Sequence, residues 1–199
     1  MTINLCVAEF SYACLPEYYH GVLGVTGTLT CLPRYIQEHL SDRYKIHKNQ
    51  LFPIPSVYGS NTENRKILNP ICVEREKLFE TVAENIGMNF KEERPILVFF
   101  RNKSEMLEFY ESKEFRALQE YTSYITEEHN HQERTRKIKN SSLKQTITLM
   151  TSSFIRGTDF KLYNKKAIKA GGFHAIVTYL IDSPADYIQA TGRVARQGK

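Results

Sequence analysis

The sequence predicts an α/β fold, in which helices flank a parallel sheet. Short runs rich in apolar and β-branched residues alternate along the chain with segments of helical period, which is typical of this class. The run Ile96–Phe100 is apolar at every position, as a strand buried on both faces should be. With 199 residues, of which 41% are hydrophobic and 25% charged, the chain is long enough to bury a core without disulfides or metal.

The first predicted helix follows the apolar run at 23–29 and ends near Asp42. Thr30 is the expected N-cap, and Pro33 falls in the first turn, where proline is tolerated. The residues that share one face of this helix are Leu32, Tyr35, Ile36, His39 and Leu40.

The expected internal boundary precedes the second helix. Prolines interrupt residues 52–58, which suits a sheet edge or a linker, and the polar residues 59–69 suit a connection. A helix is then predicted at about 74–85, ending at Gly87. The residues that stack on its inner face are Leu78, Phe79, Val82 and Ile86.

The remaining predicted elements alternate between strand and helix. After the strand at 96–100, Asn102 or Ser104 can cap a helix. The expected inward residues of that helix are Leu107, Tyr110 and Met106. Further strands are predicted at 124–125, 146–150 and 175–181, a charged helix at 132–139 and a last helix at 184–197.

Composition and charge exclude several classes of protein. No apolar run approaches the roughly 20 residues of a membrane span, and the first residues do not show a basic flank followed by an apolar core, as a signal sequence would. The four cysteines have no C-x-x-C spacing, so neither a zinc knuckle nor a dithiol site is indicated, and a reducing, cytosol-like compartment is favoured. The net charge of +5 permits a polyanionic partner without requiring one, and the basic clusters at 134–144 and 161–169 are interpreted as solvated faces.

The tetrapeptide Arg-Gly-Thr-Asp at residues 156–159 follows the predicted strand at 146–150. Open α/β sheets place their ligand-binding loops at the carboxyl ends of parallel strands, where a glycine and small polar residues are common. The alternative interpretation is an ordinary turn, because Gly and Asp are also turn residues.

Arg193 and Arg196 are three residues apart, hence adjacent on one face of the last predicted helix. Two guanidinium groups so placed could clamp one anion, because they form forked hydrogen bonds to phosphate oxygens and stay charged during γ-phosphoryl transfer. The alternative is a surface helix that forms ion pairs with nearby acids.

These motifs together resemble a known family. The strand at 96–100 with Ser104, the Arg-Gly-Thr-Asp at 156–159, and the Gln-x-x-Gly-Arg-x-x-Arg-Gln-Gly at 189–198 resemble motifs IV, V and VI of the second RecA-like motor domain in superfamily-two helicases and translocases. Residues 23–29 resemble motif III. Their Thr-Gly-Thr core, the Gly-Gly-Phe-His-Ala-Ile at 171–176 and the Arg-Gln-Gly ending point to the SecA family of ATP-driven protein translocases.

The resemblance, which extends from Ser11 to Lys199, implies a RecA-like sheet and a division of the chain. Residues 1–58 would be the end of a first motor lobe with a connector, and residues 59–199 a second lobe cut short at its C-terminus. The implied roles are arginine fingers for Arg193 and Arg196, nucleotide binding for Arg156, Gly157, Asp159 and Gln189, and coupling of nucleotide state to lobe closure for Thr26, Gly27 and Thr28.

The chain contains no G-x-x-x-x-G-K-[ST] and no acidic D-E-x-D motif, so the groups that cradle phosphates and hold magnesium are expected on a missing lobe. ATP and Mg²⁺ are the implied cofactors, and the isolated chain is expected to be inactive. The implied partners are that P-loop lobe, an unfolded preprotein and a membrane protein channel, in the cytoplasm or at the membrane periphery. The chain departs from the family at Phe154 and Ile155, whose bulk could narrow the cleft between lobes, and at Ala195.

Two other functions stay open. The chain could be the same lobe of a nucleic-acid helicase, although nucleic acid is not the expected partner, or a non-catalytic interaction fragment. His129 and His131 lack a third ligand at a recognisable spacing, so no metal site is predicted. Tyrosines such as Tyr121 and Tyr124 could stack on single strands, but packing is the expected role.

Overall fold

The computed structural model describes residues 9, 11–28, 31–54, 68–162 and 164–192. The chain divides into two compact units, residues 1–55 and 56–199. All strands of the described residues belong to the second unit.

The first unit consists of short helices joined by extended chain. The bond from Tyr44 Oη to the Ala13 carbonyl oxygen, 2.6 Å, and the ion pair between Arg43 and Glu17 join its helices. None of the described side chains in this unit is buried. Its elements are η1 (Tyr12–Tyr18), α1 (Arg34–Tyr44) and η3 (Lys48–Gln50).

Helix α1 differs from its prediction at both ends. Pro33 is the N-cap, and its carbonyl oxygen accepts from the Ile36 amide at 3.0 Å, whereas Thr30, the predicted N-cap, lies outside the described residues. The helix also passes Asp42 and ends at Tyr44, where Lys45 adopts a left-handed conformation with φ of 57°.

The second unit is built on a sheet of four parallel strands in the order β2-β3-β1-β4. In the register of the sheet, Val98 of β1 lies opposite Leu149 of β3 and Ile176 of β4. This architecture confirms the predicted α/β class. The strands are β1 (Ile96–Phe100), β2 (Thr122–Ile125), β3 (Ile147–Thr151) and β4 (His174–Val177).

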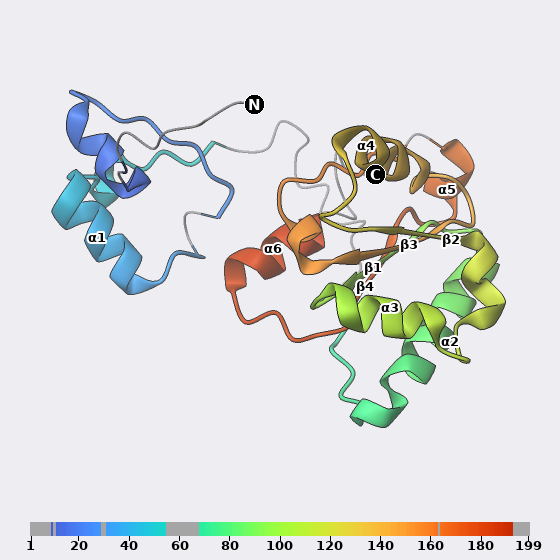
Figure 1. The fold of residues 1–199 in the computed structure, drawn as a ribbon. Coiled ribbons are helices and arrows are strands. Elements are labelled where there is room, and N and C mark those ends of the chain that lie inside the picture. Colours follow the sequence, from blue (N-terminus) through green and yellow to red (C-terminus); the bar gives the residue numbers. More distant parts are fainter. Residues whose placement is uncertain (1–8, 10, 29–30, 55–67, 163, 193–199) are drawn as a thin grey trace, which may run out of the picture. The chain divides into compact units, whose positions relative to one another are not determined.

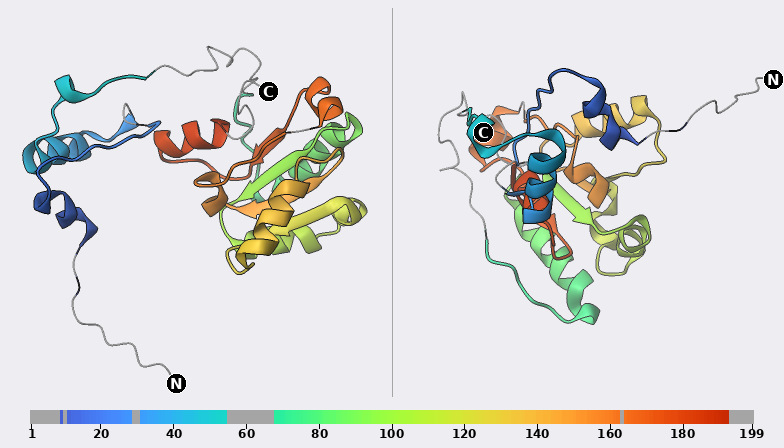
Figure 2. Two further views of the ribbon diagram at one scale, coloured as in Figure 1. Left: turned by 90° about the horizontal axis from the view of Figure 1, so that it is seen from above. Right: turned by 90° about the vertical axis from the view of Figure 1, so that its left-hand side faces the viewer.

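Helices cover both faces of the sheet (Figures 1 and 2). On one face lie α2 (Leu78–Lys91) and α3 (Lys103–Glu111), and η6 (Arg116–Tyr121) leads from α3 into β2. The other face carries α4 (His131–Asn140) and α5 (Lys165–Lys169). Ala190 of α6 (Pro184–Gly192) is buried in the hydrophobic cluster of that face, together with Ala167 of α5. The chain order and this distribution of helices match the right-handed crossovers expected between parallel strands.

Strand β1 supplies both halves of the core. Ile96, Val98 and Phe100 pack beneath α2 and α3, whereas Leu97 and Phe99 pack against the loop after β3 and against α5 and α6. All five residues are fully buried, which confirms that an uninterrupted apolar run here marks a central strand.

Several other predictions are confirmed or corrected. Asn102 caps α3, because its Oδ1 accepts from the Glu105 amide at 2.9 Å. The predicted stop at Gly87 is wrong: α2 continues to Lys91, which lets Phe90 pack on the core. The predicted strand 175–181 ends early, at Val177, and the last helix is described only as far as Gly192.

Candidate functional site

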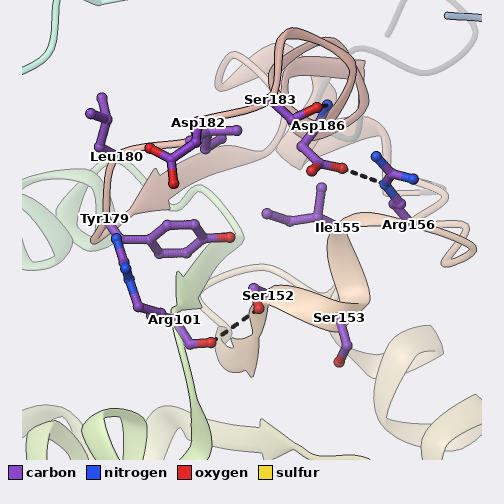
Figure 3. Close-up of a pocket in the computed structure, with 11 residues that line it drawn as sticks. Arg101, Ser152, Ser153, Ile155, Arg156, Tyr179, Leu180, Asp182, Ser183 and Asp186 are labelled. Carbon is purple, nitrogen blue, oxygen red and sulfur yellow. Dashed lines mark hydrogen bonds and ion pairs between the residues drawn. The ribbon is translucent and has the colours of Figure 1, made fainter. Parts of the chain in front are cut away.

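The candidate site is a pocket of about 450 Å³ at the carboxyl ends of β1, β3 and β4 (Figure 3). Arg101 follows β1, Ser152 and Ser153 follow β3, and residues 179–183 follow β4. Open parallel sheets bind their ligands at this edge, because the loops after neighbouring strands converge there.

Arg101 and Tyr179 form one wall of the pocket. The Arg101 guanidinium carbon lies 5.6 Å from the centre of the Tyr179 ring, and the Ser152 hydroxyl donates to the Arg101 carbonyl oxygen at 3.0 Å. Burial and the nearby Asp186 charge raise the pKa of Tyr179, against the opposing effects of Ser152 and Arg101. The phenol therefore stays neutral at physiological pH and can donate a hydrogen bond.

Arg156 and Asp186 form an ion pair on the opposite side of the pocket (Figure 3). The pair ties the loop after β3 to the first turn of α6, where the Ser183 hydroxyl accepts from the Asp186 amide at 3.4 Å. Arg156 is the more exposed partner, with 63% of its side chain accessible against 35% for Asp186. The Arg156 guanidinium is thus positioned by α6 and remains largely exposed to solvent.

The rest of the Arg-Gly-Thr-Asp tetrapeptide lies in the loop after β3. Gly157 has φ of 70°, a conformation that favours glycine, and no described atom comes within 4 Å of a Cβ built there. Asp159 is exposed and lies 3.2 Å from the Lys161 ammonium.

The bulk at Phe154 does not narrow the pocket. Phe154 and Ile155 are both buried, at 6% and 2% exposure, in the cluster that contains Phe99 and Phe160. Ile155 also contributes to the pocket wall, whereas Phe154 does not. The expectation that Phe154 and Ile155 narrow a cleft between lobes stays a prediction.

The other predicted site residues lie elsewhere. Gln189 is half-buried on α6, which the structure describes as far as Gly192. The arginine pair, Ala195 and the Arg-Gln-Gly ending lie outside the described residues. Thr26, Gly27 and Thr28 belong to the first unit, where Thr26 Oγ1 accepts from the Thr28 amide at 3.2 Å and so fixes a local turn. Among the residues that the structure describes, no three or more His, Cys, Asp or Glu side chains gather as a metal site would require.

Sequence reasoning missed Arg101, Tyr179, Asp182 and Asp186 as pocket residues. A signal for the first two exists, because each follows a short apolar run by one or two positions and so lies at the carboxyl edge of the sheet. Asp186, the ion-pair partner of Arg156, has no such signal, because it lies 30 residues away in the sequence and only the fold brings the two side chains together.

No family model matches the chain. Over 195 residues it is 26% identical to the protein translocase subunit SecA of Helicobacter hepaticus, with 96% of this chain and 21% of the relative covered. The SecA subunit of Phocaeicola vulgatus is 29% identical over 203 residues, covering 98% of this chain and 17% of the relative, and that of Wolinella succinogenes is 28% identical over 196 residues, covering 96% and 21%.

The chain is related to the SecA family. Similarity to SecA extends over both units, since the matches cover nearly the whole chain, which confirms the predicted resemblance. The chain spans about a fifth of the length of these SecA relatives. No helix in the described part of the chain is long and apolar enough to cross a membrane.

Proposed function

We propose that this SecA relative supplies the second RecA-like motor lobe of an ATPase that moves polypeptide. Residues 59–199 form that lobe, and residues 1–58 end the first lobe and connect the two. The observation that carries the proposal is the contact between a loop and a helix: the Arg156–Asp186 ion pair joins the Arg-Gly-Thr-Asp loop after β3 to α6 at the pocket.

The position of α6 supports a role for the arginine pair. Gly192 ends the described helix, and Arg193 is the next residue in the sequence. Helix α6 begins beside the pocket, and Arg193 and Arg196 follow it in the sequence. In the proposed motor their guanidinium groups bind the phosphates of the nucleotide. There they would neutralise charge that develops during γ-phosphoryl transfer.

The pocket has groups that suit a nucleotide. Arg101 and Arg156 are cationic, and Ser152, Ser153 and Ser183 offer hydroxyls. Asp182 and Asp186 oppose an anion, so a phosphate must compete with Asp186 for Arg156. When bound, ATP with Mg²⁺ supplies the transferable phosphoryl group, and the P-loop and acidic residues that hold the metal would come from the other lobe.

The first unit supports the assignment of residues 1–58 to a larger lobe. None of its described residues is buried, and Leu23 and Val25 in the extended stretch 21–26 are almost fully exposed. A segment with this much apolar surface gains stability by adding to an existing core, because the burial of one Leu or Val side chain contributes about 1.5–3 kcal/mol.

The proposed partners follow from the SecA relationship. They are a P-loop lobe, an unfolded preprotein and a membrane protein channel, with action in the cytoplasm or at the membrane periphery. The names of the relatives, protein translocase subunits, support this choice over a nucleic-acid helicase.

Complementation tests the proposal. The chain is assayed for phosphate release from ATP alone and after fusion to the P-loop lobe of a SecA relative. We expect no turnover by the chain alone and clear turnover by the fusion, above that of the P-loop lobe by itself. Steady ATP hydrolysis by the rigorously purified chain, or no gain on fusion, would contradict the proposal.

A further inference from the structure

Lys137 on α4 points its ammonium group at a carbonyl and a histidine. Its Nζ lies 2.8 Å from the Tyr124 carbonyl oxygen, 2.9 Å from His129 Nε2 and 4.8 Å from the centre of the Tyr124 ring. A carbonyl oxygen only accepts hydrogen bonds, so Nζ donates one of its hydrogens to Tyr124.

The other side of the His129 ring fixes its tautomer. The backbone N–H of Thr126 donates to His129 Nδ1 at 3.0 Å, and Thr126 is buried, with 2% exposure. Since a backbone N–H can only donate, Nδ1 carries no proton and the single proton of the neutral ring is on Nε2. The Thr126 hydroxyl, also 3.0 Å from Nδ1, can donate to the same lone pair.

An Nε2–H that faces Nζ at 2.9 Å needs an acceptor, but an ammonium group has only donors. The opposite tautomer would set Nδ1–H against the buried Thr126 N–H and leave that N–H unsatisfied, which costs about 1–3 kcal/mol. The contact with Nε2–H therefore disfavours the ammonium form of Lys137, whereas the neutral form of the amine would accept from Nε2–H and donate to Tyr124.

The charged groups around Lys137 act in both directions. Burial of the side chain lowers the pKa of Lys137, Glu133 on the same helix raises it, and Arg136 lowers it, with a net lowering. Across the packed elements, β2 contributes Tyr124 and the following loop contributes the His129 ring, while Glu128 is paired with Lys103. Among the residues that the structure describes, no carboxylate lies within ion-pairing distance of Nζ to hold its proton.

We propose that Lys137 is an acceptor site for a small acyl group from an activated acyl donor, because its contact with His129 favours the neutral form of the amine, which is the form that reacts. In the reaction, Nζ attacks the carbonyl carbon and an N–C bond forms. The bond from that carbon to the leaving group breaks, the leaving group takes the electron pair, and one amine proton passes to water. The product amide keeps an N–H for the Tyr124 carbonyl and adds a C=O that can accept from His129 Nε2–H.

Trace labelling tests this site in the full chain without any nucleotide. The protein is acetylated with a small amount of acetic anhydride at pH values from 5 to 11, and the rate at each lysine is measured by peptide mass spectrometry. Lys139, exposed on the same helix, is the internal reference. We expect the acetylation rate of Lys137 to reach half its maximum at a lower pH than that of Lys139, with at least a tenfold difference in proton concentration. Its maximal rate should be lower, because its lone pair must turn away from His129.

A matched variant tests the cause. In His129→Gln, the amide oxygen can accept from the ammonium group, so the half-maximal pH of Lys137 should rise towards that of Lys139, which itself should not change. Circular dichroism checks that the variant is folded, and the comparison of the two lysines in the unaltered chain stands without it. Equal half-maximal pH values for Lys137 and Lys139, or no acetylation of Lys137 up to pH 11, would overturn the proposal.

Discussion

His174, the first residue of β4, shows how the fold holds one ionisable group neutral. Its Nε2 lies 2.8 Å from Asn85 Oδ1 on α2, an acceptor, so Nε2 carries the proton of the neutral ring. Nearby, the Arg94 guanidinium donates to the carbonyl oxygens of Gly171, Gly172 and Phe173 just before the strand. Burial, together with the charge of Arg94, lowers the pKa of His174 from 6.5 to about 4.

This shift predicts a loss of stability in acid. Between pH 6.5 and about 4 the unfolded chain binds a proton at His174 that the folded chain does not, so the free energy of unfolding falls as the pH falls through that window. The loss should be on the order of 2 kcal/mol by pH 4, allowing for partial exposure of the ring, and absent above pH 7. Urea unfolding at a series of pH values measures it.

His174→Asn is the matched control, because asparagine can still donate to Asn85 and does not titrate. The difference in stability between the unaltered chain and this variant should shrink as the pH falls from 7 to 4. Two curves that stay parallel over this range would show that His174 is not the group responsible.

At the scale of elements, Gly87 and Gly157 allow the effect of backbone conformation to be tested apart from side-chain packing, because a methyl group added at either position would contact no other atom. Gly87 lies inside α2, whereas Gly157 has φ of 70° in the loop after β3, and at neither position does a built Cβ meet an atom within 4 Å. Gly87→Ala should stabilise the protein by about 0.5–1 kcal/mol, because alanine loses less conformational entropy in a helix. Gly157→Ala should destabilise it by about 1 kcal/mol, because alanine is strained at this φ.

Thermal unfolding measures both changes, which should move the midpoint in opposite directions by about 2–4 °C. The two variants control for each other, since each adds the same methyl group to an open position. If both midpoints move the same way, backbone conformation is not what distinguishes these sites.

The elements that the sequence predicts well are those with a strong local signal. Ile96–Phe100 is apolar throughout and forms β1 as predicted, and the Asn102 cap is a side chain placed just before a helical period. The end of α2 was not predictable from Gly87, because tertiary packing of Phe90 extends the helix beyond it. The run 175–181 has the composition of one strand, but only its first part finds a partner in β1.

The candidate site likewise combines residues that have a local sequence signal with residues that only the fold brings together. The Arg-Gly-Thr-Asp loop and the last helix were recognisable as sequence patterns, and the structure brings both to the carboxyl edge of the sheet. Arg101 and Tyr179 carry no motif, and their proximity depends on the pairing of β1 with β4. Strand order, which local patterns do not encode, decides which loops meet.

For the whole molecule, the proposed translocase differs from a helicase in what stimulates it. A helicase lobe must track a phosphate backbone, so strands should stimulate its ATPase and bind with an affinity that falls steeply as salt rises. For the fusion with a P-loop lobe we expect stimulation by an unfolded preprotein, and only weak strand binding due to the net charge of +5. ATP hydrolysis that depends on single strands, with no response to preprotein, would favour the helicase.

The arginine pair provides the most direct test of the proposed motor, because Arg193 and Arg196 would act on a nucleotide held mainly by the other lobe. In the active fusion, turnover and nucleotide affinity are measured for Arg193→Ala and Arg196→Ala, with Arg→Lys at each position as the control that keeps charge but loses the forked geometry. We predict that turnover falls on the order of 10³-fold while affinity changes much less, and that lysine rescues poorly. Unchanged turnover in Arg196→Ala would contradict the proposed motor. It would favour the alternative, in which the two arginines form ion pairs on a surface helix.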